Sequence, residues 1–130
     1  MLRFFIIGLG GAIGTILRYV MGGLDYRFSN GVFPVSTLIV NVIGSLAIGF
    51  FWGIVDRFEI SPNIRLFIFI GILGGYTTFS TFSLETFNFM RDGEYRIAFA
   101  NVVLSVVLSI GAVFAGYIAS KALMNLFKGV

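Results

Sequence analysis

The chain has 130 residues, of which 58% are hydrophobic and 12% are charged, and its mean hydropathy is +0.99. Ordinary globular domains have about 25% charged residues, so this composition is that of an integral membrane protein. The sequence contains no cysteine and no histidine, which excludes disulfides, thiolate chemistry and the usual proton relay. The net charge of +3 comes from scattered lysines and arginines, a pattern typical of membrane anchoring and not of nucleic-acid binding.

Four apolar stretches are each long enough to cross a bilayer, which takes about 20 residues of helix. We therefore predict an all-α membrane protein with a single domain over residues 1–130 and four transmembrane helices. The N-terminal stretch is expected to be retained as the first span, because no signal-peptide cleavage site with small residues follows it. The predicted spans are residues 4–22, 32–55, 66–89 and 97–123.

The positive charges give almost no preference for either orientation in the membrane. Five lysines and arginines lie on the side of the termini and the middle loop, against four on the opposite side. The positive-inside rule therefore leaves open one fixed topology with a weak bias, or insertion in both orientations with antiparallel pairing. Because four spans are too few to enclose an aqueous path, we expect an oligomer, most simply a two-fold dimer.

The first span contains small residues and one arginine. Gly10 and Gly14 have the four-residue spacing that lets helices approach closely, so packing is the favoured interpretation of these glycines. Arg18 lies about one turn before the end of the span. Its guanidinium either extends to the membrane surface or belongs to a cationic vestibule that attracts anions.

Polar residues form one stripe on the second span and another on the fourth. In each stripe the spacing is i, i+4 and i+8, which places the side chains on one face of a helix. Hydrogen bonding between helices would explain either stripe alone, whereas two stripes favour a shared polar route. The stripes consist of Thr37, Asn41 and Ser45 on the second span and of Asn101, Ser105 and Ser109 on the fourth.

The third span contains glycines and hydroxyl side chains at a depth where lipid-facing residues are expected. This segment runs from Gly74 to Ser83 and reads GGYTTFSTFS. Gly74-Gly75 permits backbone torsions that break a helix, and free carbonyls at such a break can coordinate a cation. We therefore predict a break near Gly74–Thr78, the alternative being that these small residues serve packing.

Two phenylalanines follow the predicted break on one helical face. They are Phe79 and Phe82, and the hydroxyls of Ser80, Thr81 and Ser83 lie beside them. A phenylalanine ring has a positive edge and a negative face, so its edge can meet an anion. Such a pair is usually lipid-facing or part of a core, but the surrounding hydroxyls weaken that interpretation.

Acidic residues are nearly absent from the spans. Glu85, near the end of the third span, either has a functional role or reaches water, and its protonation state stays open. The first, second and fourth spans contain no aspartate or glutamate. A carrier coupled to protons or cations usually needs such carboxylates, so this class is disfavoured.

Taken together, the motifs resemble the Fluc family of small bacterial fluoride channels. The resemblance rests on residues 74–83, on Asn41-Val42-Ile43-Gly44 and on Gly10–Gly14 followed by Arg18-Tyr19, and it covers essentially the whole chain. It implies a dual-topology antiparallel homodimer in the bacterial cytoplasmic membrane. It also implies two fluoride pores lined by both subunits and one structural sodium ion at the dimer interface.

The resemblance further implies roles for individual residues. The rings of Phe79 and Phe82 would present their edges to the anion, and Arg18 would lie toward the aqueous vestibule. The backbone carbonyls of Gly74 and Thr77 would bind the sodium ion. The role of Asn101 stays open. The remaining pore residues would be Asn41, Ser80, Thr81, Ser105 and Ser109.

This assignment is chemically consistent. Fluoride is strongly hydrated, so a pore must replace its water with hydrogen-bond donors, and the polar stripes contain no lysine or arginine that would hold the ion too tightly. The sequence shows no ATP site, so passive export is expected. One alternative is a small dual-topology multidrug exporter, which needs a glutamate in its first span. Another is a non-transporting membrane assembly protein, while an enzyme is not expected without paired carboxylates.

Overall fold

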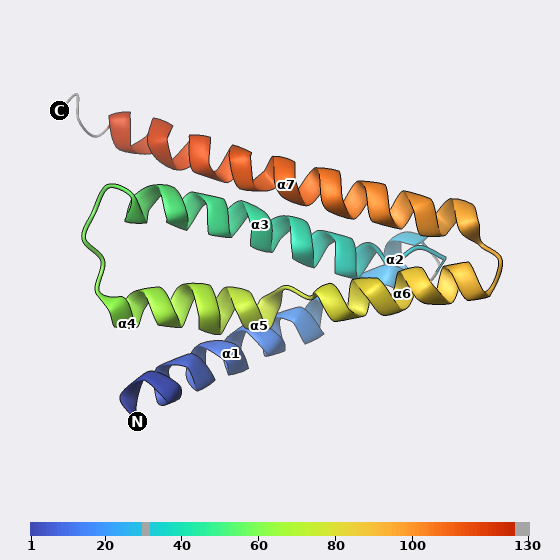
Figure 1. The fold of residues 1–130 in the computed structure, drawn as a ribbon, viewed down its shortest axis with the longest axis horizontal. Coiled ribbons are helices and arrows are strands. Elements are labelled where there is room, and N and C mark those ends of the chain that lie inside the picture. The colour runs from blue at the N-terminus through green and yellow to red at the C-terminus, as the bar shows by residue number, and fades with distance from the viewer. Residues whose placement is uncertain (30–31, 127–130) are drawn as a thin grey trace.

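The computed structural model describes residues 1–29 and 32–126, and its regular structure over these residues is entirely helical. Among them, four helices are long and apolar enough to cross a membrane, which confirms the predicted fold class of an all-α membrane protein with four spans. The spans run up and down in sequence order (Figure 1). Their bounds are Leu2–Met21, Val35–Val55, Pro62–Arg91 and Tyr95–Leu126.

The first two spans are joined by a short helix that the sequence patterns did not indicate. Helix α1 (Leu2–Met21) is followed by α2 (Leu24–Ser29) and then by α3 (Val35–Val55). Pro34 precedes α3 and offers no side-chain cap. The Asp25 carboxylate of α2 fulfils this role, since it accepts hydrogen bonds from Ser36 N at 2.6 Å and Ser36 Oγ at 2.7 Å.

The third span is divided into four pieces. Its first helix, α4 (Pro62–Arg65), begins four residues before the predicted span, with Pro62 in the first turn and Ser61 Oγ accepting a hydrogen bond from Ile64 N. A π-helix, η1 (Leu66–Leu73), and the short α5 (Gly74–Tyr76) complete the half before the break. Helix α6 (Phe79–Arg91) completes the half after it.

The break lies at Thr77 and Thr78, whose backbones are extended. It therefore falls inside the predicted segment, but the glycines do not supply its torsions. Gly74 keeps helical torsions, at φ −65° and ψ −35°. Gly75 serves packing instead, because a Cβ atom there would lie 2.7 Å from the carbonyl oxygen of Gly11.

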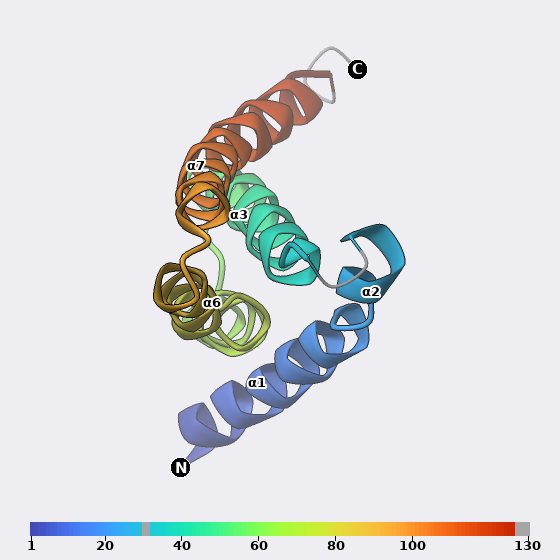
Figure 2. The ribbon, with the colours of Figure 1, turned by 90° about the vertical axis from the view of Figure 1, so that its right-hand side faces the viewer.

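Most of the described structure consists of two pairs of packed helices. Figure 2 looks along the helices and shows α7 (Tyr95–Leu126) against α3. The second pair is α1 with the first half of the third span, where a Cβ atom on Gly10 would lie 2.7 Å from Phe67 O and one on Gly14 would collide with Ile72 O. This confirms packing as the role of both glycines.

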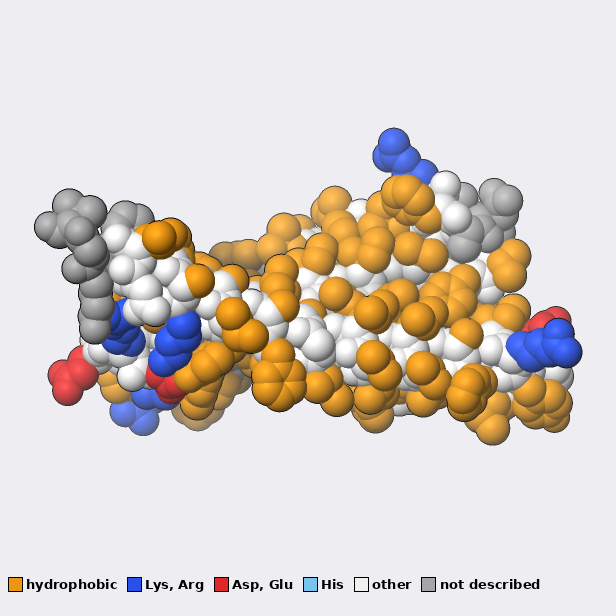
Figure 3. All heavy atoms as spheres, turned by 90° about the horizontal axis from the view of Figure 1, so that it is seen from above, with side chains coloured by type: hydrophobic (Ala, Val, Ile, Leu, Met, Phe, Trp, Pro, Cys, Tyr) orange, Lys and Arg blue, Asp and Glu red, His pale blue; other side chains and the backbone are white. Residues whose placement is uncertain are grey.

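The molecular surface agrees with insertion in a bilayer. Viewed from the α7 side, hydrophobic side chains cover the middle of the molecule and charged side chains gather toward its two ends (Figure 3). At one end, Gly93 makes the turn between α6 and α7 with a φ of +82°, a conformation that favours glycine. The neighbouring Asp92 carboxylate accepts a hydrogen bond from Arg91, which lowers the pKa of Asp92.

Candidate functional site

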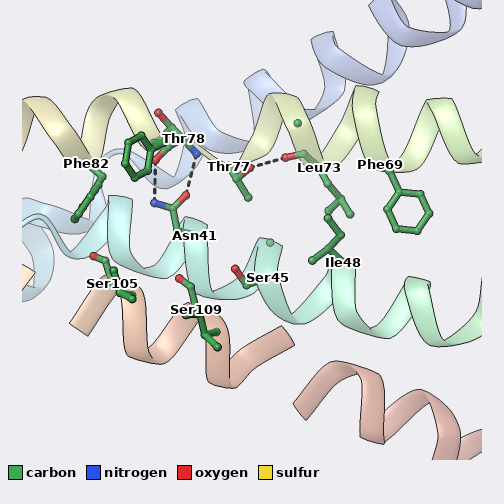
Figure 4. Close-up of a pocket in the computed structure, with 15 residues that line it drawn as sticks. Asn41, Ser45, Ile48, Phe69, Leu73, Thr77, Thr78, Phe82, Ser105 and Ser109 are labelled. Atoms are coloured by element: carbon green, nitrogen blue, oxygen red, sulfur yellow. Dashed lines mark hydrogen bonds between the residues drawn. The ribbon is translucent and has the colours of Figure 1, made fainter. Parts of the chain in front are cut away.

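A groove with a volume of about 490 Å³ lies beside the helix break. Its walls come from α3, from both halves of the third span and from α7 (Figure 4). Asn41 and Ser45 of one polar stripe and Ser105 and Ser109 of the other line the groove, whereas Thr37 and Asn101 do not. No residue among its described lining is charged. The polar lining consists of Asn41, Ser45, Thr77, Thr78, Ser105 and Ser109.

Asn41 holds the extended backbone at the break. Its Nδ2 donates to Thr78 O at 3.0 Å, and its Oδ1 accepts from Thr78 N at 2.8 Å (Figure 4). Backbone polar groups in a membrane must be satisfied within the protein, so this pair of bonds makes the break tolerable. An amide nitrogen carries two hydrogens, so one remains beyond the bond to Thr78.

The two phenylalanines both line the groove but differ in burial. Phe82 is 9% exposed, whereas Phe79 is 78% exposed at the start of α6. Their ring centroids are 5.4 Å apart and the rings are tilted by 48°. Phe79 therefore leaves a large aromatic surface that a second molecule or lipid must cover.

The hydroxyls next to these phenylalanines are used locally. Thr78 Oγ1 accepts a hydrogen bond from Thr81 N and so caps the N-terminus of α6. It also donates to Thr81 Oγ1 at 2.9 Å and lies 3.4 Å from Ser80 Oγ. Ser80 and Thr81 are exposed side chains in the first turn of α6, directly after the break, and neither is among the residues that line the groove.

At the break, two backbone N–H groups donate to side chains and not to the carbonyls that a continuous helix would offer them. In a continued helix, Thr78 N would donate to Gly74 O and Thr81 N would donate to Thr77 O. These amides instead donate to Asn41 Oδ1 and Thr78 Oγ1. Gly74 and Thr77, the two residues predicted to bind sodium, are therefore among the residues whose carbonyls lose their helical donors, and the same spacing includes Gly75 and Tyr76.

Arg18 turns toward the break. Its Nη1 donates to Thr77 O at 3.2 Å, 59 residues away in the sequence, and its side chain is half-buried. A carbonyl oxygen has two lone pairs, so Thr77 O can accept this bond and still face a cation. Among the described residues no group of three His, Cys, Asp or Glu side chains could hold a metal ion.

Thr37 and Glu85 form a pair that sequence reasoning missed. Thr37 Oγ1 donates to Glu85 Oε1 at 2.6 Å, across 48 residues of sequence. The second carboxylate oxygen, Oε2, is buried without a hydrogen-bond partner among the described residues. Thr37 was singled out as part of a stripe and Glu85 as an acid within a span, but no spacing joined them.

Asn101, on α7, directs its side chain toward α6. It is fully buried, its Nδ2 donates to Thr86 Oγ1 at 3.0 Å, and its Oδ1 accepts from Ser105 Oγ at 3.4 Å. Thr86 and the cap residue Thr78 were not singled out from the sequence. A hydroxyl residue immediately before the Phe79 helix was the available signal for Thr78, since threonine is a favoured N-cap.

Fold and groove together define a small four-span membrane protein whose helix break opens onto a groove lined by both apolar and uncharged polar side chains. A family model described as "CrcB-like protein, Camphor Resistance (CrcB)" matches residues 5–117. The chain belongs to this CrcB-like family. Together with the names of the relatives given next, this membership confirms the resemblance to the Fluc family.

Curated relatives of the chain carry the name fluoride-specific ion channel FluC. The relative from Parabacteroides distasonis is 44% identical over 128 residues, covering 98% of this chain and 100% of the relative. The relative from Opitutus terrae is 45% identical over 126 residues and covers 95% of both chains. The relative from Pyrococcus abyssi is 42% identical over 114 residues, which is 87% of this chain and 91% of the relative. These names designate ion channels and not enzymes, in agreement with the expectation that the chain is not an enzyme.

Proposed function

We propose that this protein is a passive, fluoride-selective channel that exports fluoride across the bacterial cytoplasmic membrane. The names of its relatives support a fluoride channel. The observation that carries the proposal is the groove beside the break, whose described polar lining consists of amide and hydroxyl groups without a charged side chain. Passive conduction requires favourable but weak binding, which such neutral donors provide.

The donors in the groove match the chemistry of a small anion. The remaining Asn41 N–H and the hydroxyls of Ser45 and Ser109 offer hydrogens to an ion that leaves its water behind, and Ser105 does so when its hydroxyl turns away from Asn101. The edges of the Phe79 and Phe82 rings add partial positive charge. The hydroxyls of Ser80 and Thr81 do not line the groove but would extend the route along the first turn of α6, and Arg18 would attract the anion toward an aqueous vestibule.

A second copy of the chain is proposed as the missing wall of the groove. Polar side chains exposed to hydrocarbon are costly, so the polar side chains of the groove need a cover. A two-fold dimer supplies that cover and duplicates the groove, giving two pores. The near balance of positive charges favours antiparallel insertion of the two subunits.

A structural sodium ion belongs to this proposal as well. The carbonyls of Gly74 and Thr77 would hold it, since the break withdraws their helical donors. Two subunits would contribute four such oxygens, a suitable set for a hard cation. The positive ion would balance the partial negative charges of the carbonyl oxygens that gather at the dimer interface. It would thereby hold the helix breaks of the two subunits together.

Fluoride efflux from liposomes that contain the purified protein tests the proposal. We expect fluoride to leave at a rate well above that of protein-free vesicles, while chloride leaves at the background rate. Fluoride flux equal to that of protein-free vesicles would refute the channel.

The same measurement distinguishes the alternatives. A membrane assembly protein would give background flux of both ions. A multidrug exporter would move organic cations in response to a proton gradient, and the first span contains no glutamate for that coupling.

A further inference from the structure

A series of three hydrogen bonds, each donating to the next residue, connects the groove-lining hydroxyl of Ser105 with the backbone of α6. Ser105 Oγ donates to Asn101 Oδ1 at 3.4 Å, and Asn101 Nδ2 donates to Thr86 Oγ1 at 3.0 Å. Thr86 Oγ1 then donates to the carbonyl oxygen of Phe82 at 2.9 Å. The two ends of the series, Ser105 and Phe82, both line the groove.

The hydroxyl of Thr86 fixes the orientation of the Asn101 amide. A hydroxyl has one hydrogen, and Thr86 uses it on Phe82 O. If the amide turned over, Asn101 Oδ1 would face Thr86 Oγ1 with no hydrogen between them. Asn101 is 0% exposed, so water does not compensate such a loss.

The fixed amide determines where the Ser105 hydrogen points. Asn101 Oδ1 accepts that hydrogen, so the lone pairs of Ser105 and not its hydrogen are left for the groove. An anion in the groove needs the hydrogen. The distance of 3.4 Å is long for a hydroxyl donor, whose usual range is about 2.5–3.0 Å, so the hydroxyl is weakly held and rotates at low cost.

We infer that Asn101 is a positioning residue that competes with the permeating anion for the Ser105 hydrogen, in an orientation imposed by Thr86. This inference rests on the proposed fluoride conduction through the groove. The competition weakens anion binding at Ser105, which favours release and therefore throughput. Asn101 thus acts through Ser105, from behind the groove wall.

Thr86→Val gives the first test, because valine has nearly the shape of threonine but no hydroxyl. The amide of Asn101 is then free to turn over and donate to Ser105, which frees the Ser105 hydrogen for the anion. We expect the fluoride concentration at half-maximal conductance in planar bilayers to fall by about two- to tenfold, the range for one hydrogen bond, with a lower maximum. Thr86→Ser keeps the hydroxyl and serves as the matched control with wild-type behaviour.

A double-mutant cycle separates positioning from a general structural effect. Asn101→Leu should lower the half-maximal concentration in the wild-type background but leave it unchanged in a Ser105→Ala background. An equal shift in both backgrounds would overturn the inference, because Asn101 would then act without Ser105.

The comparison of Thr86→Val with Thr86→Ser does not depend on the Ser105 variant. An unchanged half-maximal concentration in Thr86→Val, or complete loss of conduction in protein that still elutes as the wild type does, also overturns the inference. Thr86→Ala replaces the valine variant if that variant fails to fold by gel filtration. Wild-type protein that does not conduct refutes the proposed function, whereas a conducting wild type with unshifted variants refutes only the role of Asn101.

Discussion

The side-chain amide of Asn41 supports the break and faces the groove at the same time. Asn41→Asp removes the hydrogens that bond Thr78 O and the anion, and it places an acceptor where a donor is needed. We expect fluoride flux in liposomes to fall by about tenfold or more. Asn63→Asp, at an exposed position of α4, is the control and should conduct normally. Equal flux in both variants would remove Asn41 from the route.

The ring edges of Phe79 and Phe82 make a second prediction at this scale. Phe79→Ile and Phe82→Ile keep apolar bulk but remove the positive edge, so each should lower fluoride flux by about fivefold or more while the oligomer survives. Phe99→Ile replaces a similarly exposed ring on α7, 72% exposed, and should leave the flux unchanged. Normal flux in both groove variants would exclude the ring-edge role.

Some residue-level features followed from the sequence and others did not. Helical periodicity put Asn41 and Ser45 on one face and Ser105 and Ser109 on another, and both faces line the groove. Periodicity acts within one helix, so it cannot show which helices meet. The bond from Arg18 to Thr77 O spans 59 residues and depends on how α1 packs, which no local spacing encodes.

At the scale of elements, the close approach of α1 to the third span should determine stability. A Cβ atom on Gly14 would collide with Ile72 O and lie 2.8 Å from Tyr76 N, just before the break. Gly14→Ala should therefore lower the free energy of unfolding by about 1–3 kcal/mol, the usual cost of overpacking.

Gly8→Ala is the matched control, because a Cβ atom there would have no neighbour within 4 Å. Resistance to heat in detergent, followed by gel filtration, measures both variants. If the Gly14→Ala protein is as heat-resistant as the Gly8→Ala protein, α1 shifts at little cost to make room for the added methyl group, which contradicts the predicted overpacking.

The position of the break illustrates what sequence can and cannot predict about an element. Glycine and hydroxyl residues inside an apolar span correctly indicated a break, yet the extended residues are Thr77 and Thr78. Asn41 stabilises this position from another helix, 37 residues away. The Asp25 carboxylate of the short helix α2 caps α3 from 11 residues away, which the helical spacing of the spans does not encode.

At the scale of the whole molecule, the balanced charges predict two orientations in the membrane. A tag placed at either terminus should be labelled from both faces of the membrane in intact cells, because five and four positive charges give almost no bias. The same tag on a membrane protein of fixed topology controls for leakage. Labelling from a single face would argue against the antiparallel dimer.

The length of α7 has a consequence for the surrounding lipid. Its 32 residues rise about 48 Å along the axis, whereas the hydrocarbon core is about 30 Å thick. Even at a tilt of about 40° the whole helix rises further than the core is thick, so its ends, among them the last turns with Lys121, lie outside the hydrocarbon core. Tyr117 and Lys121 approach Asp56 at that end of the helix, which ties the projecting part to α3. In an antiparallel pair, one projecting end of α7 would emerge on each face of the membrane. Both leaflets would then undergo the same local deformation.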